Sequence, residues 1–421
     1  MLIHSAAQLV TLTAQPQRGS RMGELNIIPD GAVLIEGESI AAVGPSRELL
    51  ERYPHEERYD AGGRAVIPGF VDPHTHLIWA GNRAAEFEMR LEGKSYMEIM
   101  AAGGGIQSTV NATRAATPAD LLAQTRARAR EIFALGSTTA EAKTGYGLEW
   151  ESELKEMQML LELGRQGPLE IWPTFLPAHA VPSEYAGRAD AYVALICDRM
   201  LPELKAWWAA NAAGRPLPFV DVFCEKGAFS LEQTRRIFES AQNLGYPLKV
   251  HADEFENLGG ARLAMQMGAA SADHLVKTSP EEIALFGQSP TAAVALPCTP
   301  FGLHEEDYTP AKAIIENDGL LALASDLNPG TAWCGNMQFV IALACRAMRL
   351  TPAEALCAAT INAAAAVRRD ELVGSLEAGK QADALVLQSS DFRDLAYRFG
   401  VNQVQTVIKK GEVVYNAPAT L

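Results

Sequence analysis

Eight short β-rich runs alternate with helical segments along the middle of the chain, and this order restricts the fold more than any other feature. Amphipathic segments such as ESELKEMQMLLELGRQ and LEQTRRIFESAQNLG separate some of the runs. Eight strands, each followed by a helix or a loop, predict a (β/α)8 barrel rather than an open sheet. The predicted strands are residues 65–76, 138–144, 169–176, 217–225, 246–253, 271–275, 291–298 and 320–326.

The two ends of the chain differ in texture from the middle. Short β-like segments, GAVLIEGESIAAVG near the start and VQTVIKKGEVVYN near the end, are bounded by glycine and charged residues. Neither end is long enough to bury a core of its own. We therefore predict one small β-sandwich domain built from residues 1–65 and 368–421, attached to a barrel formed by residues 66–367.

Composition excludes several classes of partner. The chain has 421 residues and a formal net charge of −15, from 51 acidic and 36 basic residues. An acidic protein without a Lys/Arg run is a poor candidate for binding nucleic acid or anionic membranes. No run approaches the roughly 18 apolar residues of a membrane span, and the start lacks the pattern of a signal peptide. The six cysteines form no CxxC pair, so we expect reduced thiols in a cytoplasmic protein.

Histidines gather where a barrel enzyme places its active site, at the carboxyl ends of the predicted strands. In VDPHTH, His74 and His76 are separated by one residue, so on a strand both side chains point the same way. A polar strand end would explain one such pair, but five of the eight histidines lie at or just after strand ends: His74, His76, His179, His251 and His274. Three imidazoles and a carboxylate suit one Zn²⁺ or Fe²⁺ with a position left for water. The predicted ligands are His74, His76, His251 and Asp326.

These motifs resemble those of the amidohydrolase superfamily. PGFVDPHTH and SDLNPGT carry the resemblance, and GSLEAGKQADALVL resembles the segment by which such enzymes return from the barrel to the small β-domain. Within the superfamily, GNRAAEFEMRLEGKSYMEIMAAGGGI, KTGYGLEWESELK, FLPAHAVPSEY and HADEFENLGGARLA resemble the imidazolonepropionase family along nearly the whole chain. The resemblance implies hydrolysis of 4-imidazolone-5-propanoate to N-formimino-L-glutamate, a step of histidine degradation.

The resemblance also implies catalytic roles for three residues. The expected cofactor is one metal ion, divalent zinc or iron as Fe²⁺ or its oxidised form Fe³⁺. It would lower the pKa of its bound water, and Asp326 would accept the proton. Glu254, three residues after His251, would orient the substrate ring and pass a proton to the leaving nitrogen. His274 would polarise the carbonyl group under attack or fix the water.

The propionate of that small-molecule substrate needs a cation in this acidic protein. The resemblance points to Arg83, whose planar guanidinium can hold a carboxylate through two hydrogen bonds. Tyr146 and His179 would add donors along the substrate. Further contacts to substrate or product are expected after Asp326, from Asn328, Gly330 and Thr331. Enzymes of this kind are often homodimers, and we expect one here.

Several alternatives stay open at this stage. A deaminase of the same superfamily, acting on a purine or pyrimidine ring, is the alternative activity, although it would have no evident use for Arg83 with Tyr146. A non-catalytic scaffold is disfavoured because all four metal ligands are present. The ligand set accepts zinc and iron alike.

Some residues near the site have no assigned catalytic role. Lys143 is interpreted as structural or as a cation behind the site, and a carbamylated lysine bridging two metals is the lesser alternative. Glu225 and Asp253 are also expected behind the site. The segment 297–310 departs from the form expected around the seventh strand. We expect it to touch none of the proposed ligands.

Overall fold

The computed structural model describes residues 1–94, 98 and 104–418. Part of the motif GNRAAEFEMRLEGKSYMEIMAAGGGI therefore lies outside the described residues. Eight parallel strands, hydrogen-bonded in sequence order, form the barrel, so the predicted barrel is confirmed. The strands are β6 (Phe70–Asp72), β7 (Ser137–Lys143), β8 (Glu170–Ala178), β9 (Phe219–Cys224), β10 (Lys249–Ala252), β11 (Ser271–His274), β12 (Ala292–Ala295) and β13 (Leu321–Leu323).

The barrel closes just beyond the ends of its first and last strands. The backbone N–H of His76 donates to the carbonyl of Leu327 at 2.9 Å, and that of Asp326 donates to the carbonyl of His74 at 3.1 Å. Thr75 and Leu327 form an isolated parallel bridge between the same segments. Closure is thus made by residues predicted to bind the metal and by their immediate neighbours.

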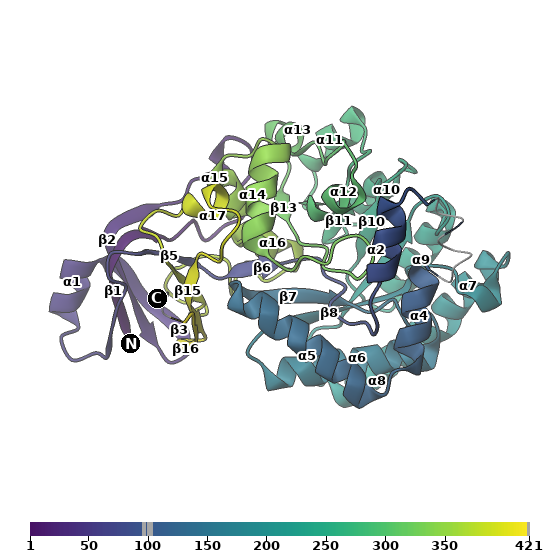
Figure 1. Ribbon diagram of the computed structural model, residues 1–421, viewed down its shortest axis with the longest axis horizontal. Coiled ribbons are helices and arrows are strands. Elements are labelled where there is room, and N and C mark those ends of the chain that lie inside the picture. The colour runs from purple at the N-terminus through teal and green to yellow at the C-terminus, as the bar shows by residue number, and fades with distance from the viewer. Residues whose placement is uncertain (95–97, 99–103, 419–421) are drawn as a thin grey trace.

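Helices cover the outside of the barrel (Figure 1). Capping boxes begin α9, α11 and α15, where a serine or threonine and the glutamine or glutamate three residues later satisfy the first free N–H groups. Among the described helices, none combines the length and apolar character needed to cross a bilayer. The helices of this part are α2 (Ala84–Leu91), α4 (Ile106–Ala115), α5 (Pro118–Ala134), α6 (Trp150–Gln166), α7 (Ala189–Leu195), α8 (Leu201–Asn211), α9 (Leu231–Asn243), α10 (Gly260–Gln266), α11 (Pro280–Phe286), α12 (Cys298–Leu303), α13 (Ala311–Glu316), α14 (Met337–Ala347), α15 (Pro352–Ala358), α16 (Ile361–Ala366) and α17 (Asp394–Tyr397).

Both ends of the chain contribute to a second, mixed sheet, which lies beside the barrel (Figure 1). Its strands follow one hydrogen-bonded path, β16-β15-β14-β5-β1-β2-β3, with β4 paired to β1. The division at residues 65 and 368 stays our proposal for the domain boundary. The elements are β1 (Leu2–Val10), β2 (Ile27–Glu36), β3 (Ser39–Pro45), α1 (Ser46–Arg52), β4 (Arg58–Asp60), β5 (Ala65–Pro68), β14 (Ala384–Leu387), β15 (Val404–Lys409) and β16 (Glu412–Asn416).

The run predicted as a single strand over residues 65–76 is two strands in two sheets. β5 pairs antiparallel with β14 in the terminal sheet, and β6 begins the barrel. Gly69 joins them and donates its N–H to the carbonyl of Asp383 at 3.1 Å. A Cβ at this position would lie 2.3 Å from Oγ1 of Thr138, on β7. Only glycine fits where the chain passes this close to β7.

The terminal sheet and the barrel share one hydrophobic core. Ile67, Leu385 and Val404 of the sheet belong to the same cluster of buried residues as Phe70 of the barrel. The shared core fixes the start of β6, and therefore the first pair of histidines, relative to the terminal sheet.

All six cysteines are free thiols, as predicted, although Cys334 and Cys345 are partly exposed.

Gly69→Ala should lower the free energy of unfolding by about 1–3 kcal/mol, because the added methyl overpacks the contact with Thr138. Denaturant titration followed by circular dichroism measures the change. Gly400→Ala is the matched control, since its Cβ would meet no atom within 4 Å, and it should change stability by less than about 0.5 kcal/mol. Thr138→Ala should recover part of the loss in the Gly69→Ala background. Equal losses at both glycines would refute the contact.

Candidate metal centre and active site

The four predicted metal ligands converge at the carboxyl ends of the barrel strands. Nε2 of His74 and Nε2 of His76 lie 3.5 and 3.6 Å from Oδ1 of Asp326, and Nε2 of His251 lies 3.2 Å from Nε2 of His76. Donor atoms of a tetrahedral zinc site with bonds near 2.1 Å are separated by about 3.4 Å. The spacing of these side chains therefore fits one divalent metal ion.

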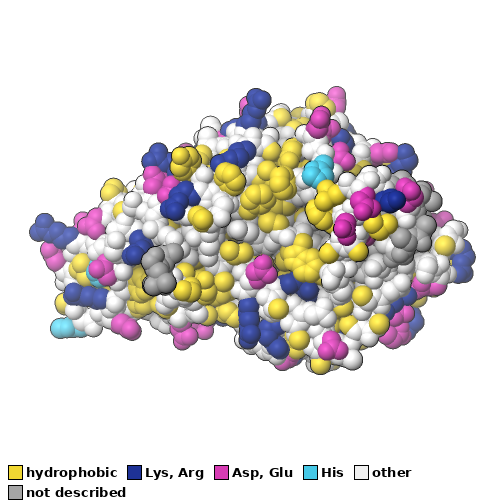
Figure 2. Space-filling view, viewed as in Figure 1, with side chains coloured by type: hydrophobic (Ala, Val, Ile, Leu, Met, Phe, Trp, Pro, Cys, Tyr) yellow, Lys and Arg dark blue, Asp and Glu magenta, His cyan; other side chains and the backbone are white. Residues whose placement is uncertain are grey.

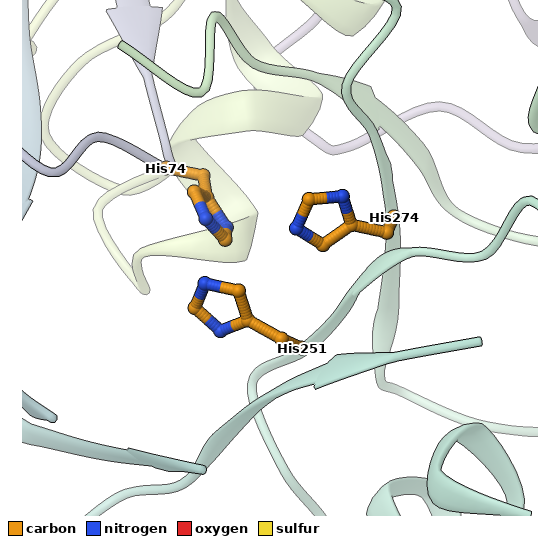
Figure 3. Close-up of side chains that lie close together, drawn as sticks. All are labelled: His74, His251 and His274. Atoms are coloured by element: carbon orange, nitrogen blue, oxygen red, sulfur yellow. The ribbon is translucent and has the colours of Figure 1, made fainter. Parts of the chain in front are cut away.

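His274 belongs to the same cluster. The donor atoms of His74, His251 and His274 lie within 4.8 Å of one another, as do those of His74, His76 and Asp326. Figure 3 shows the rings of His74, His251 and His274 facing a common space from three segments of the barrel. Among the described residues, Nε2 of His74, Nε2 of His274 and Oδ1 of Asp326 are buried without a hydrogen-bond partner. Unpartnered buried donors and acceptors are rare unless a ligand meets them.

Burial sets the protonation of the cluster. It lowers the pKa of His74, His76 and His274 well below the ordinary value, and neighbouring positive charges act in the same direction. Neutral imidazoles are the form that binds metal. Burial also raises the pKa of Asp326 to about 6.

Backbone strain marks three strand ends around the cluster. Asp253, His274 and Asp326 have φ values of 57°, 79° and 54°, a left-handed conformation that residues other than glycine seldom adopt. Such conformations cost energy and persist where the surrounding structure enforces them, often at functional positions. Here each of the three residues lies at the end of a barrel strand or within three residues after it.

One cavity of about 600 Å³ opens onto the cluster. His76, His251, His274 and Asp326 form part of its wall. On the face of the molecule in Figure 2, Lys and Arg side chains are interspersed with Asp and Glu, whereas the cavity lining includes the cations Arg83 and Lys226. The cavity also brings together all of the predicted substrate-contacting residues: Arg83, Tyr146, His179, Glu254, Asn328, Gly330 and Thr331.

Arg83 reaches the cavity in a fixed orientation. Its Nε donates to Oε2 of Glu86 at 2.8 Å and its Nη2 to Oε1 of the same carboxylate, so one edge of the guanidinium is already bound. The Nη1–Nη2 edge remains as a second planar fork. A Cβ on Gly330 would lie 2.3 Å from Nη1, which means that the bare backbone of Gly330 makes room for the guanidinium.

His179 and Tyr146 line the cavity beside the predicted metal ligands. The ring of His179 stacks on that of His76, with ring centroids 4.7 Å apart. Its Nδ1 lies 3.0 Å from the carbonyl oxygen of Gly145, so Nδ1 carries the hydrogen and Nε2 is an acceptor. The sequence led us to expect His179 to donate to the substrate, whereas this neutral tautomer accepts. Tyr146 is buried, and burial raises the pKa of its phenol, which keeps it a donor.

Glu254 is held by the loop after β10. The carboxylate of Glu225 accepts the N–H groups of Phe255 and Glu256, at 2.9 and 3.2 Å, and so fixes the two residues that follow Glu254. Oε2 of Glu254 lies 3.7 Å from Nε2 of His274. Burial, with added repulsion from Asp326, raises the pKa of Glu254 well above its ordinary value. A carboxyl group in this state can carry a proton at neutral pH.

The loop after Asp326 is organised by one side chain. Nδ2 of Asn328 donates to the carbonyl of Asp326 at 2.7 Å, and its Oδ1 accepts the N–H groups of Gly330 and Thr331, each at 2.8 Å. Asn328 therefore shapes the cavity wall as well as lining it.

The prediction for the segment 297–310 was wrong: it contacts one predicted ligand, Asp326, and also the predicted catalytic residue His274. Oγ1 of Thr299 donates to Oδ2 of Asp326, and Oγ1 of Thr309 donates to the carbonyl of His274 at 2.5 Å. Helix α12 begins directly after β12 and carries Thr299 to the Asp326 carboxylate. Neither contact could be inferred from the sequence, because the sequence of this segment does not indicate which of its residues lie beside the neighbouring strand ends.

Lys143 lies behind the metal cluster and is completely buried. Its Nζ donates to Glu141 and Asp221, at 2.7 Å in each case. A lysine that donates to two carboxylates is an ammonium, so the carbamylated form has no support here. Asp253 is buried and accepts a hydrogen bond from Thr278 at 2.7 Å.

Comparison with known proteins identifies the family. Models of the amidohydrolase family match residues 225–414 and 57–114, and a model of the bacterial imidazolonepropionase-like composite domain matches residues 31–55. An imidazolonepropionase of Herpetosiphon aurantiacus is 50% identical over 413 residues, which cover 98% of this chain and 96% of the relative. One of Chloroflexus aggregans is 47% identical over 418 residues, with 98% of each chain covered. The chain belongs to the imidazolonepropionase family.

Solved structures show the same fold at much lower identity. An adenosine deaminase of Xanthomonas campestris with bound zinc has a TM-score of 0.73 at 20% identity, covering 98% of this chain and 92% of its own. The guanine deaminase of E. coli has a TM-score of 0.72 at 16% identity, covering 99% of each chain. These likenesses concern the amidohydrolase fold alone, whereas the sequence relatives place the chain in the imidazolonepropionase family.

Sequence reasoning missed several residues that shape this member of the imidazolonepropionase family. Glu86 and Thr299 each bind a predicted functional side chain. Phe223 and Ile106 line the cavity. Of these residues, Glu86 could have been found from the sequence, because it follows Arg83 by three residues, a common spacing for ion pairs on a helix.

Acid should destabilise the protein in part through His179. Burial lowers the pKa of His179 to about 3, whereas an unfolded histidine titrates near 6.5. The stabilising contribution of the neutral ring is thus complete above about pH 6.5 and is lost as the pH falls toward 3. His179→Gln should reduce the slope of unfolding free energy against pH by up to about 1.4 kcal/mol per unit between about pH 6 and 4.

Urea unfolding at a series of pH values, with chelator present, measures that slope. His55→Gln removes an exposed histidine and is the control. An unchanged slope in His179→Gln, or an equal change in both variants, would count against the buried neutral ring.

Proposed function

We propose that this chain hydrolyses 4-imidazolone-5-propanoate to N-formimino-L-glutamate, using one divalent metal ion. Membership of the imidazolonepropionase family supports this activity. The observation that carries the proposal is the single cavity in which the metal-binding cluster and Arg83 face the same space. One end of such a cavity suits a cyclic amide and the other suits a carboxylate.

The metal would be held by His74, His76, His251 and Asp326, with His274 at its side. When bound, a divalent metal supplies water that ionises near neutral pH and a charge that polarises the amide carbonyl. Oδ1 of Asp326 faces the histidines and would bind the metal, while Oδ2 accepts from Thr299. We assign the carboxylate of Asp326 to take the proton of the attacking water.

Ring opening requires a proton at the leaving nitrogen. Water adds to the carbonyl carbon, the bond from this carbon to the ring nitrogen breaks, and the nitrogen takes up a proton. Glu254, whose raised pKa favours the protonated acid, is the donor in this scheme. His274, with its Nε2 3.7 Å from the carboxyl group of Glu254, would orient the carbonyl oxygen between them.

The propionate would be held by the Nη1–Nη2 edge of Arg83. Glu86 occupies the other edge and fixes the plane of the guanidinium, which reduces the ordering that binding would otherwise require. Tyr146 would donate to the substrate, and Nε2 of His179 would accept from a ring N–H.

A deaminase is the weaker alternative. The deaminases among the solved structures share the fold at 20% and 16% identity, whereas imidazolonepropionases share 50% and 47% of the sequence. A neutral nucleobase would also offer no carboxylate to the Nη1–Nη2 edge of Arg83, the edge that Glu86 leaves open.

Three finer points remain predictions. The ligand set leaves zinc and iron as alternatives for the divalent metal. We retain a homodimer as the expected assembly and the cytoplasm as the expected location. Metal analysis of the purified protein and its mass in solution test the first two directly.

Glu254→Gln preserves the shape of the side chain but removes its exchangeable proton. We expect kcat to fall by roughly 10²–10⁴-fold while the metal content is retained. The measurements are steady-state turnover of imidazolone propionate and metal analysis of the same sample. Glu256→Gln, at the partly exposed neighbour two residues on, should stay within about twofold. A loss below about threefold in Glu254→Gln would assign Glu254 a space-filling role.

Arg83→Met should reduce kcat/KM on imidazolone propionate by about 30-fold to several thousandfold, because a buried charge pair loses one partner, at roughly 2–5 kcal/mol. The same variant should lose much less on an imidazolone whose propionate is replaced by a neutral side chain. Gly330→Ala, which displaces the guanidinium, should shift KM in the same substrate-dependent way. Equal losses on both substrates would show that Arg83 supports the fold instead, and negligible losses would reopen the deaminase alternative.

A further inference from the structure

Five charged side chains fill the barrel interior directly behind the metal-binding cluster. Each is completely buried, although charged groups are almost never fully buried unless paired. They come from four strands of the barrel and form one group, which we call the interior charge network: Glu141 and Lys143 on β7, Asp221 on β9, Lys249 on β10 and Asp273 on β11.

Two carboxylates of this network contact the remote nitrogens of two predicted metal ligands. Oδ2 of Asp273 forms a hydrogen bond of 2.6 Å with Nδ1 of His74, and Oδ2 of Asp221 lies at the ion-pair distance of 3.1 Å from Nδ1 of His251, outside hydrogen-bond geometry. In each ring, Nε2 faces the cluster. A carboxylate at Nδ1 keeps the hydrogen on that atom and leaves Nε2 free to bind a metal.

The two lysines tie the carboxylates to each other and to the chain. Lys143 donates to Glu141 and Asp221 at 2.7 Å and lies 3.8 Å from Asp273. Although burial opposes its charge, these carboxylates raise the pKa of Lys143, so it remains an ammonium.

Lys249 anchors the segment that carries the first histidine pair. Its Nζ donates to the carbonyl of Pro73 at 2.6 Å, one residue before His74, and lies 3.6 Å from Asp273. Lys249 also precedes His251 by two residues on β10. One buried cation therefore joins the backbone of one ligand segment to that of another.

We propose that Asp221 and Asp273, held by Lys143 and Lys249, are positioning residues that set the affinity of the site for its divalent metal. The inference rests on the proposed metal-dependent function and adds residues that do not line the cavity. Three carboxylates face two ammonium groups, so negative charge remains beside the two imidazoles and makes them stronger ligands. His76 differs, because among the described residues the carboxylate that pairs with it is Asp326, which reaches Nε2 rather than Nδ1.

Asp221→Asn and Asp273→Asn test the proposal. Asparagine keeps the shape and can still accept from Nδ1–H, but it lacks the charge. Competition of zinc between the full-length protein and a chelator, measured without substrate, should show affinity about 10–100-fold weaker in each variant. With zinc saturating, KM for imidazolone propionate should stay within about twofold, because neither carboxylate touches the cavity.

Asp383→Asn is the matched control. Asp383 and Lys409 form a buried pair at 2.7 Å in the terminal sheet, so this change breaks a similar contact far from the cluster. It should lower thermal stability and leave zinc affinity unchanged. Zinc affinity within about twofold of wild type in both cluster variants would overturn the proposal, as would an equal loss in Asp383→Asn.

The experiment separates this inference from the proposed activity. If Asp273→Asn does not fold, Asp221→Asn carries the same test at the other ring. Weaker zinc binding in the variants of a wild-type protein that fails to hydrolyse imidazolone propionate would refute the activity and support the positioning role. Normal activity in the wild type with unaltered zinc binding in the variants would refute the positioning role alone.

Discussion

The barrel is closed by backbone hydrogen bonds between the segment after β6 and the segment after β13, and the rest of the site depends on this closure. His76 donates to Leu327, and Asp326 donates to His74. These bonds join residues far apart in the sequence, so they form only when all eight strands have assembled. A metal bound there would link the same two segments, which couples metal affinity to folding.

The terminal sheet contributes to the same geometry from the other side. β5 runs into β6 through Gly69, so the first histidine pair is positioned by a strand whose partner, β14, comes from the opposite end of the chain. The core continues from Leu385 of the sheet to Phe70 of the barrel. The terminal sheet therefore supports the start of β6, although the sheet itself contributes no residue to the cavity wall among the described residues.

The strand order and the convergence of His74, His76, His251 and Asp326 could be predicted from the sequence because they follow short-range rules. Period-two spacing links His74 to His76, and strand ends carry His251 and Asp326 to one rim. Features that depend on tertiary contacts were predicted wrongly from the sequence or were not predicted at all. The run 65–76 reads as one strand because the close approach of Thr138 that bends it at Gly69 is a tertiary contact. The contacts of Thr299, Asp221 and Asp273 join side chains from different helices and strands, and no pattern within one segment encodes them.

One environment sets opposite protonation states for the groups that need them. Desolvation disfavours charge, so it lowers the pKa of His74, His76 and His274 and raises that of Glu254. Burial thereby favours the neutral form of the imidazoles, which is the form that binds metal, and the protonated form of Glu254. Because a single cause favours both states, a change that exposes these groups to more water would weaken metal binding and proton donation together. The loop after Glu254, which Glu225 fixes, is therefore as much a part of the proposed chemistry as the groups that face the substrate.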